Sequence, residues 1–182
     1  MRLRFSMFAL LALASASAAA GTVDINLSND TVEANYVTNA GLAEWTFGGL
    51  YNRDTKDRDL NVGLLATGES SIAGSRIEGG LGGKLYSVVV GDSQLAALAL
   101  GGQVRWFPGN GPFAIAGYGF YAPHVVTLID GERFWDVGVR AEVEVIRNSF
   151  VYIGYRQVHA VFDNQTSANV AEGAFLGMEI KF

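Results

Sequence analysis

The sequence predicts an all-β fold, a single antiparallel up-and-down transmembrane β-barrel that follows a short export leader. Three observations carry this prediction: an N-terminal segment typical of signal peptides, apolar residues that alternate with polar ones, and a last strand that ends on an aromatic residue. Each corresponds to a requirement of export or of folding in a bilayer. The expected domains are a signal peptide over residues 1–20 and a barrel over residues 21–182.

The first twenty residues have the parts of a secretory signal peptide. Arg2 and Arg4 make the segment positive, an apolar run extends from Phe5 to Leu13, and alanines alternate up to position 20. The alternative, a single membrane anchor, requires a longer apolar run followed by a stop-transfer charge. We therefore expect cleavage between Ser17 and Gly21, which leaves one domain of about 162 residues.

The composition differs from that of soluble exported domains. Hydrophobic residues make up 49% of the chain and charged residues only 17%, whereas charged residues are about 25% of typical soluble proteins. The 23 glycines also exceed the average usage of about 7%. No apolar run after the leader is long enough for a transmembrane helix. Apolar content without apolar runs is typical of strands that alternate between lipid and lumen.

Charge and cysteine content exclude several functions. Without the two leader arginines, 11 basic residues stand against 18 acidic ones, a net charge of −7. This acidic balance argues against nucleic acid as a partner. The absence of cysteine from the sequence excludes disulfides, thiolate metal sites and lipoprotein acylation.

The strand prediction rests on apolar residues at every second position. In the clearest case, alternate residues from Trp135 to Val145 are apolar, and those between them are charged or glycine. The ten expected strands cover residues 23–27, 32–36, 42–51, 60–66, 77–85, 96–106, 113–121, 135–145, 151–155 and 176–182. Ten is an even number, as two periplasmic termini require. Eight strands remain the alternative if the first hairpin lies outside the wall.

The connections alternate between short and long, as in outer-membrane barrels with short periplasmic turns and long outer loops. Short connections are expected at residues 39–41, 108–112 and 147–149, and longer polar ones at 52–59, 123–132 and 160–171. Two connections depart from this rule. Residues 67–75 are long for a periplasmic turn, and residues 91–93 are short for an outer loop.

A soluble β-sandwich also has one apolar and one polar face and is the main alternative. The barrel is favoured because the polar faces carry small residues and charges of both signs, as a crowded lumen does, and because aromatic residues lie near strand ends. The expected inner girdle consists of Trp45, Trp106, Phe113 and Phe182, and the outer girdle of Tyr51, Tyr121 and Trp135. In lipid, only a closed sheet pairs every backbone group.

Five segments of the mature chain resemble the YfaZ family of predicted outer-membrane proteins. They are Asp24–Ser28 with Asp30, ALALGGQVRW at Ala97–Trp106, GYGFYAP at Gly117–Pro123, IGYRQV at Ile153–Val158, and the closing FLGMEIKF. The resemblance implies an exported protein of the Gram-negative outer membrane. It implies almost nothing about activity.

The last strand carries the pattern that the barrel assembly machinery reads in outer-membrane proteins. Phe182 is the terminal aromatic residue, Leu176, Met178 and Ile180 alternate before it, and Gly177 occupies the usual small position. The expected partners are this machinery, outer-membrane lipid and lipopolysaccharide, and the protein is expected to be a monomer.

Strand parity predicts a network of charges inside the barrel. The ten side chains expected to face the lumen are Arg76, Glu78, Lys84, Arg105, Asp136, Arg140, Glu142, Glu144, Arg156 and Glu179. Charges withdrawn from water must pair, and we expect Arg156 to join the row formed by Arg140, Glu142 and Glu144. Two interpretations are open: the network constricts or plugs the pore, or it only stabilises the wall.

No catalytic constellation is found, and neither a metal nor a cofactor is expected. Small outer-membrane lipid A deacylases place a serine two residues after a histidine, but Val161 follows His159 at that spacing. A nucleophile and its base must lie within reach of each other, so a hydrolase is a remote alternative. We expect a structural or permeability role as a narrow or plugged barrel without enzymatic activity. The alternative is surface binding or adhesion through the outer loops, of which residues 52–59 hold six charges.

Overall fold

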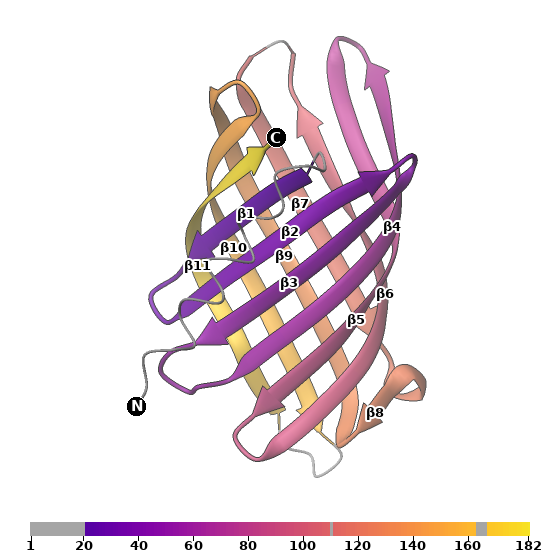
Figure 1. Cartoon of the computed structure of the whole chain (residues 1–182), viewed down its shortest axis with the longest axis vertical. Helices are drawn as coiled ribbons and strands as arrows, with labels where there is room; N and C mark the ends of the chain where they lie inside the picture. Colours follow the sequence, from indigo (N-terminus) through magenta and orange to yellow (C-terminus); the bar gives the residue numbers. More distant parts are fainter. Residues whose placement is uncertain (1–20, 110, 163–166) are drawn as a thin grey trace.

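The computed structural model describes residues 21–109, 111–162 and 167–182, which form one antiparallel sheet closed into a barrel (Figure 1). The predicted signal peptide lies outside the described residues. The strands are β1 (Gly21–Leu27), β2 (Thr31–Ala40), β3 (Ala43–Asn52), β4 (Arg58–Ile72), β5 (Ser75–Val90), β6 (Ser93–Phe107), β7 (Phe113–Ala122), β8 (Thr127–Ile129), β9 (Gly131–Ile146), β10 (Ser149–Phe162) and β11 (Ser167–Lys181).

Ten strands make the wall, and the short β8 is an addition to it. Each strand from β1 to β6 pairs with its successor as far as β7, β7 pairs with β9, β9 with β10, and β11 pairs with both β10 and β1. Two further backbone bonds of 2.9 Å join the amide of Gly21 to the carbonyl of Phe182 and the amide of Phe182 to the carbonyl of Gly21. The prediction of a ten-stranded barrel is confirmed, and the first hairpin belongs to the wall.

The barrel has two ends of different construction. The terminal end, uppermost in Figure 1, holds Gly21, Phe182 and the tight turns at residues 41–42, 73–74 and 147–148. The opposite loop end holds the connections 28–30, 53–57, 91–92 and 123–130. The connection 123–130 contains a 3-10 turn, η1 (His124–Val126), and then β8, which pairs with β6 where β7 no longer reaches. Among the described residues, no helix is long and apolar enough to cross a membrane.

Two predicted connections are strands instead. Residues 67–75 extend β4 and β5 into a hairpin whose turn is only Ala73 and Gly74, beyond the last β3 pairing at Ala66. This extension is exposed on both faces, so its sequence has no apolar alternation to reveal it. Residues 160–162 and 167–171 of the other connection are likewise strand. There, a bulge at Val158/His159 shifts the register and interrupts the period of two.

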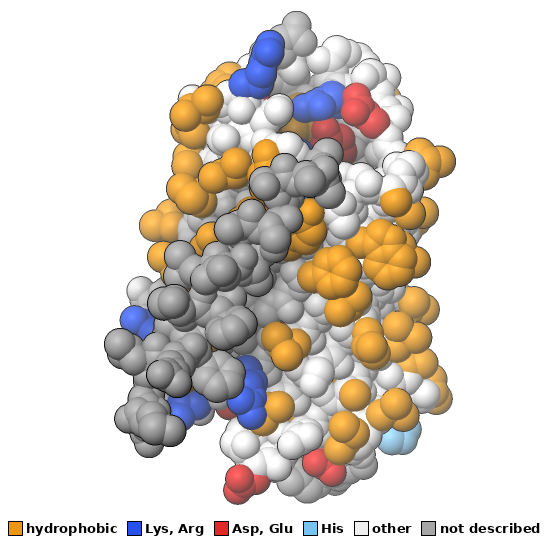
Figure 2. All heavy atoms as spheres, viewed as in Figure 1, with side chains coloured by type: hydrophobic (Ala, Val, Ile, Leu, Met, Phe, Trp, Pro, Cys, Tyr) orange, Lys and Arg blue, Asp and Glu red, His pale blue; other side chains and the backbone are white. Residues whose placement is uncertain are grey.

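The two faces of the wall have the predicted parity. The outward side chains of Leu100, Val139 and Leu176 are 64%, 53% and 63% exposed, whereas the inward Glu142 and Arg156 are 1% and 2% exposed. Figure 2 shows hydrophobic side chains spread over the visible side of the barrel. All the predicted girdle aromatics except Trp135 are among the exposed hydrophobic residues, near the ends of their strands. Trp135 is partly covered because its ring stacks on His159 at 4.2 Å.

Glycines make room for aromatic rings inside the narrow lumen. Gly138, Gly154 and Gly177 are the cross-strand partners of Tyr118, Phe175 and Tyr152. A methyl group on any of the three would approach the partner's ring within 2.4–2.6 Å, so no other residue fits without moving the ring. This cross-strand arrangement accounts for part of the glycine excess in the sequence.

The barrel lumen as the candidate functional site

Towards the loop end, the lumen is filled by apolar side chains, which we call the apolar layer. Its members are Leu50, Leu65, Tyr86, Val88, Leu95, Ala97, Ala99, Phe120, Ala122, Phe134, Val158, Ala160, Phe162, Val170 and Ala171. All are buried, and they form one continuous cluster. The lumen is therefore occupied by protein at this depth. The expected network of charges does not extend here.

The loop between β3 and β4 is tied down next to this layer. Asn52 is 3% exposed and donates through Nδ2 to the carbonyl of Val170, 3.2 Å away on β11. Its Oδ1 accepts from the amides of Asp54 and Thr55 at 3.0 and 3.2 Å. Since β3 and β11 are not neighbours in the sheet, this contact spans the loop end of the lumen.

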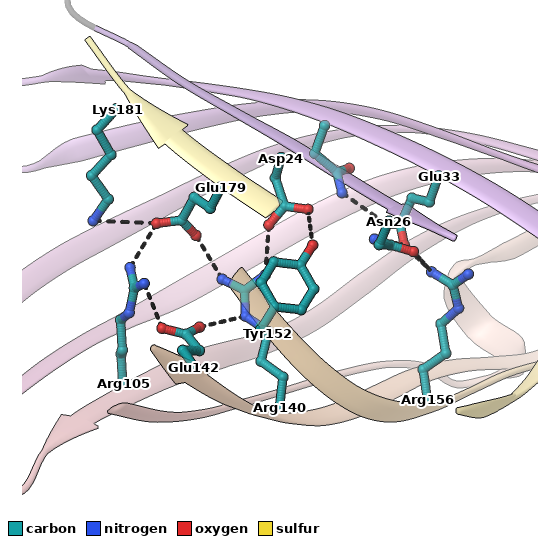
Figure 3. A network of polar contacts seen from close by, with 11 residues as sticks. Asp24, Asn26, Glu33, Arg105, Arg140, Glu142, Tyr152, Arg156, Glu179 and Lys181 are labelled. Atoms are coloured by element: carbon teal, nitrogen blue, oxygen red, sulfur yellow. Dashed lines mark hydrogen bonds and ion pairs between the residues drawn. The ribbon is translucent and has the colours of Figure 1, made fainter. Parts of the chain in front are cut away.

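Towards the terminal end, a network of ion pairs crosses the lumen (Figure 3). Glu142 on β9 lies between Arg105 and Arg140 and pairs with both, at 2.6 Å to Arg140 Nε. Glu179 on β11 bridges the same two arginines at 2.8 and 2.7 Å. Arg140 also reaches Asp24 on β1 at 2.5 Å, and Asp24 accepts a hydrogen bond from the Tyr152 hydroxyl.

This arrangement brings together four of the ten predicted lumen residues and adds others from distant strands. Arg105 comes from β6, Arg140 and Glu142 from β9, and Glu179 from β11. The charged groups are at most 21% exposed. Buried charges of both signs that share partners satisfy each other where water does not reach.

Arg156 lies in a second polar cluster, against expectation. Its guanidinium pairs with Glu33 on β2 and donates to Asn26 Oδ1 at 2.8 Å and to Thr31 Oγ1 at 2.7 Å. The expected row on β9 is on a neighbouring strand, but the long side chain extends across the lumen to β1 and β2 instead. The prediction that Arg156 joins Arg140, Glu142 and Glu144 is therefore wrong.

Three further predicted residues lie outside the network. Glu144 is exposed and accepts from the amide of Asn148 at 3.0 Å, so it caps the β9–β10 turn. Arg76 pairs with Glu78 at 2.7 Å and lies 3.8 Å over the ring of Phe107 at the terminal end. These positions are close to strand ends, where a charged side chain is nearer to solvent than to a partner on the other side of the lumen.

Asp136 and Lys84 occupy the middle of the lumen without an ion pair to each other. Asp136 accepts through Oδ2 from the Tyr86 hydroxyl at 2.8 Å. The ammonium of Lys84 lies 4.5 Å from the ring centroid of Phe120, a cation–π contact. Sequence reasoning identified both as inward residues but gave them no particular partners.

The sequence also carried a signal for the residues that were missed. Asp24, Asn26 and Glu33 lie on the polar face of the first hairpin, with the same period of two that identified the other lumen charges. Tyr152 alternates with apolar residues on β10 and therefore faces inward. Parity thus places these side chains in the lumen. It does not say which strand they will meet there.

A polar cavity of about 480 Å³ adjoins the ion-pair network. It reaches the terminal end, where Gly41 and Leu42 of the β2–β3 turn line it, and extends inwards as far as Asn61 and Asp136. Seven acidic and four basic side chains are among its lining residues. The cavity is thus a charged chamber in one half of the barrel.

The C-terminal strand has an outward apolar face and an inward polar one. Leu176, Met178, Ile180 and Phe182 are exposed on the outer wall, while Gly177 faces the ring of Tyr152 and Glu179 enters the network. The sequence pattern proposed for assembly therefore coincides with the strand that closes the barrel on β1.

His159 lies on the outer wall in a chain of polar contacts. It contacts Asn169, which donates to Glu172, and the Tyr155 hydroxyl contacts Glu172 at 3.3 Å. Val161 is the next outward residue of β10 and offers no hydroxyl. The described residues hold no group of three His, Asp or Glu side chains that could bind a metal ion.

The fold and its interior define a class of protein: a small antiparallel β-barrel, closed by ten strands, with an apolar exterior and a charged lumen. The family model described as YfaZ precursor matches residues 1–182, and the chain belongs to the YfaZ family. No curated protein matches the chain. Because the family is described as a precursor, a cleaved leader is consistent with this assignment.

Proposed function

We propose that the chain is an outer-membrane protein of Gram-negative bacteria and forms a closed, non-conducting barrel with a structural or permeability role. Support for the membrane comes from the apolar outer wall with aromatic residues near both ends. The terminal end then faces the periplasm, with its short turns, and the loop end faces outwards. The expected partners are outer-membrane lipid, lipopolysaccharide and, during biogenesis, the barrel assembly machinery. The protein acts as a monomer and has no enzymatic activity.

The observation that carries the closed state is the presence of two obstructions in series. The apolar layer occupies the lumen near the loop end, and the ion pairs of Arg105 and Arg140 cross it near the terminal end. An ion passing through would meet closely packed and mainly apolar side chains in one half, among which Asp59 is the buried cross-strand partner of Leu50 and Val88, and charges already paired in the other. Barrels of eight strands leave an interior just filled by side chains; in this ten-stranded barrel, side chains obstruct the lumen at two depths and leave the polar cavity beside the ion pairs.

Single-channel recording in planar bilayers tests this proposal with four proteins. They are the wild type, Arg140→Ala with Arg156→Ala, Phe134→Ala with Phe162→Ala, and the variant that combines all four changes. We expect no steady conductance from the wild type or from either double variant, because one obstruction remains in each. The combined variant should conduct while its migration on unheated gels shows that it is folded.

The outcomes distinguish the interpretations of the network. If the double variant Arg140→Ala with Arg156→Ala conducts by itself, the charged side chains close the pore and the apolar layer lets ions pass. A folded combined variant that stays silent would mean that the charges only stabilise the wall. A wild type with stable open currents would contradict the closed state altogether.

A second candidate, binding at the cell surface, is favoured by the loop between β3 and β4. Arg53, Asp54, Lys56 and Arg58 are exposed there, while Asn52 holds the loop in place. A fixed loop with exposed charges of both signs suits contact with lipopolysaccharide phosphates. Its test is binding of lipopolysaccharide micelles to the wild type and to Arg53→Gln with Lys56→Gln; equal binding would remove this candidate.

A further inference from the structure

We propose that the cavity in the terminal half of the lumen binds a small linear diamine, with one ammonium group at Glu44 and the other at Asp136. This inference goes beyond the closed barrel, because it assigns a ligand to the space that the side chains leave unfilled. A volume of about 480 Å³ is within the range of about 300–1,000 Å³ for small-molecule sites.

The charge of the cavity favours a cation. Seven acidic side chains line it against four basic ones. Arg105, Arg140 and Lys181 already have acidic partners, and Glu33 and Glu78 are paired with arginines. Among the described residues that line the cavity, Glu44, Glu69 and Asp136 are the acids left without an ion pair. Glu69 is exposed on the hairpin of β4 and β5, whereas Asp136 is buried and Glu44 is partly buried.

Two buried oxygen atoms are left without donors in the same cavity. Within the described part of the chain, Asn61 Oδ1 and Asp136 Oδ1 have no hydrogen-bond partner, and each of these residues is only 9% exposed. Buried acceptors without donors are rare and costly. An ammonium group supplies up to three N–H donors and no acceptor, so it satisfies both the charge and the hydrogen bonding.

The placement of the two carboxylates on different strands of one cavity favours a linear dication. Glu44 Oε1 accepts from Gln103 Nε2 at 2.7 Å, which fixes its depth at the level of Gln103. The strand register places Gln103 opposite Tyr118, and Tyr118 opposite Gly138. Asp136 lies two residues from Gly138 on the same strand. A flexible linear diamine is the class of ligand whose two ammonium groups can contact carboxylates on two strands at once.

Lys84 provides a second test of the proposal, because its charge is opposite to that of the two acids. Its ammonium lines the same cavity and lies over the ring of Phe120, and among the described residues it has no ion pair. A bound diamine must tolerate this like charge. Removing it should therefore strengthen binding, whereas removing an acid should weaken it.

Titration calorimetry of the mature protein in detergent micelles, with 1,4-diaminobutane as the probe, tests the site. We expect saturable binding to the wild type. Asp136→Asn and Glu44→Gln should each weaken binding by about tenfold, and Lys84→Met should strengthen it by about tenfold, because each change alters one charge beside the ligand. The matched control is Glu144→Gln, which removes one acid at the terminal end but outside the cavity, and should bind as the wild type does.

Several outcomes would overturn the proposal. Absence of saturable binding by both the wild type and Lys84→Met would do so, and so would a loss for Glu144→Gln as large as that for Asp136→Asn, since the attraction would then be unspecific. Should a lumen variant fail to fold, the wild type alone remains decisive: butylamine, with one ammonium, should bind about tenfold more weakly than the diamine, and equal affinity excludes two-point binding. Binding in micelles is read independently of conductance, so failure here leaves the closed barrel untouched.

Discussion

The two halves of the lumen solve the same packing problem with opposite chemistry. Near the loop end, aromatic rings such as Phe120 and Phe134 pack against Ala97, Ala99 and Ala160. Near the terminal end, long arginine side chains reach across to carboxylates on other strands and leave a cavity beside them. The comparison shows that apolar side chains of mixed size form one buried cluster across the lumen, whereas paired charges cross it and leave a cavity beside them.

The reason lies in what each kind of side chain requires. Apolar groups need only contact, so large and small residues can be combined until no space remains. Charged groups need a partner at a fixed distance and orientation, and their positions follow from those contacts rather than from volume. The polar half should therefore depend on single residues that are shared between pairs, and the apolar half on summed volume.

The largest effect is expected from Glu142→Ala in the polar half. This change removes the carboxylate shared by Arg105 and Arg140 and leaves two buried cations with one fewer partner each. Breaking a buried ion pair by truncating one side typically costs about 3–5 kcal/mol. Urea unfolding in lipid vesicles should show this loss. The charge-removing control Glu144→Ala, at the exposed end of the same strand, should change the free energy of unfolding by less than about 0.5 kcal/mol.

The next effect is expected from Phe134→Ala in the apolar half. Phe134 is fully buried and its ring lies 4.5 Å from that of Tyr86. Truncation leaves a cavity and should cost about 3 kcal/mol in the same unfolding assay. Phe134→Leu retains most of the volume and should recover more than half of the loss. If the two variants were equally destabilised, the ring contact rather than volume would dominate, and the proposed difference between the halves would fail.

The sequence was sufficient to predict the strands of the wall, but it was insufficient to predict which side chains meet inside the lumen. The alternation in β9 predicted a strand with one apolar and one polar face, and the pattern that ends at Phe182 predicted the last strand; both strands are part of the wall. The partners of Arg156 were not predicted, because parity says only that a side chain faces inward, while its partner depends on strand register and on the reach of the side chain. The apolar layer was missed for a related reason: Ala97 and Ala99 look like small residues of a polar face until Phe120 and Phe162 are placed opposite them.

A smaller effect is expected from Gly177→Ala, which tests how tightly the polar half is built. An added methyl group would lie 2.4 Å from the Tyr152 ring, so the ring must move away from Asp24. We expect a loss of about 2 kcal/mol, within the range for overpacking. Gly79→Ala is the control, since the nearest atom to its new methyl group would be 3.6 Å away. A Gly177→Ala barrel as stable as the control would show that the tyrosine is free to shift.

The smallest effect is expected from Tyr152→Phe, which separates the ring from its hydroxyl. The ring remains opposite Gly177 and beside Phe175, at 5.9 Å between centroids, so packing is preserved. Only the hydrogen bond to Asp24 is lost, and Asp24 keeps its ion pair with Arg140. The cost should be about 1–2 kcal/mol, because a buried charged acceptor loses one donor.

Tyr155→Phe is the matched control: its hydroxyl contacts Glu172 at 3.3 Å on the exposed outer wall, and its loss should be close to zero. Equal losses of unfolding free energy for the two variants would mean that the hydrogen bond to the buried Asp24 contributes no more to stability than the exposed contact with Glu172. The polar half would then be held together by shape, as the apolar half is.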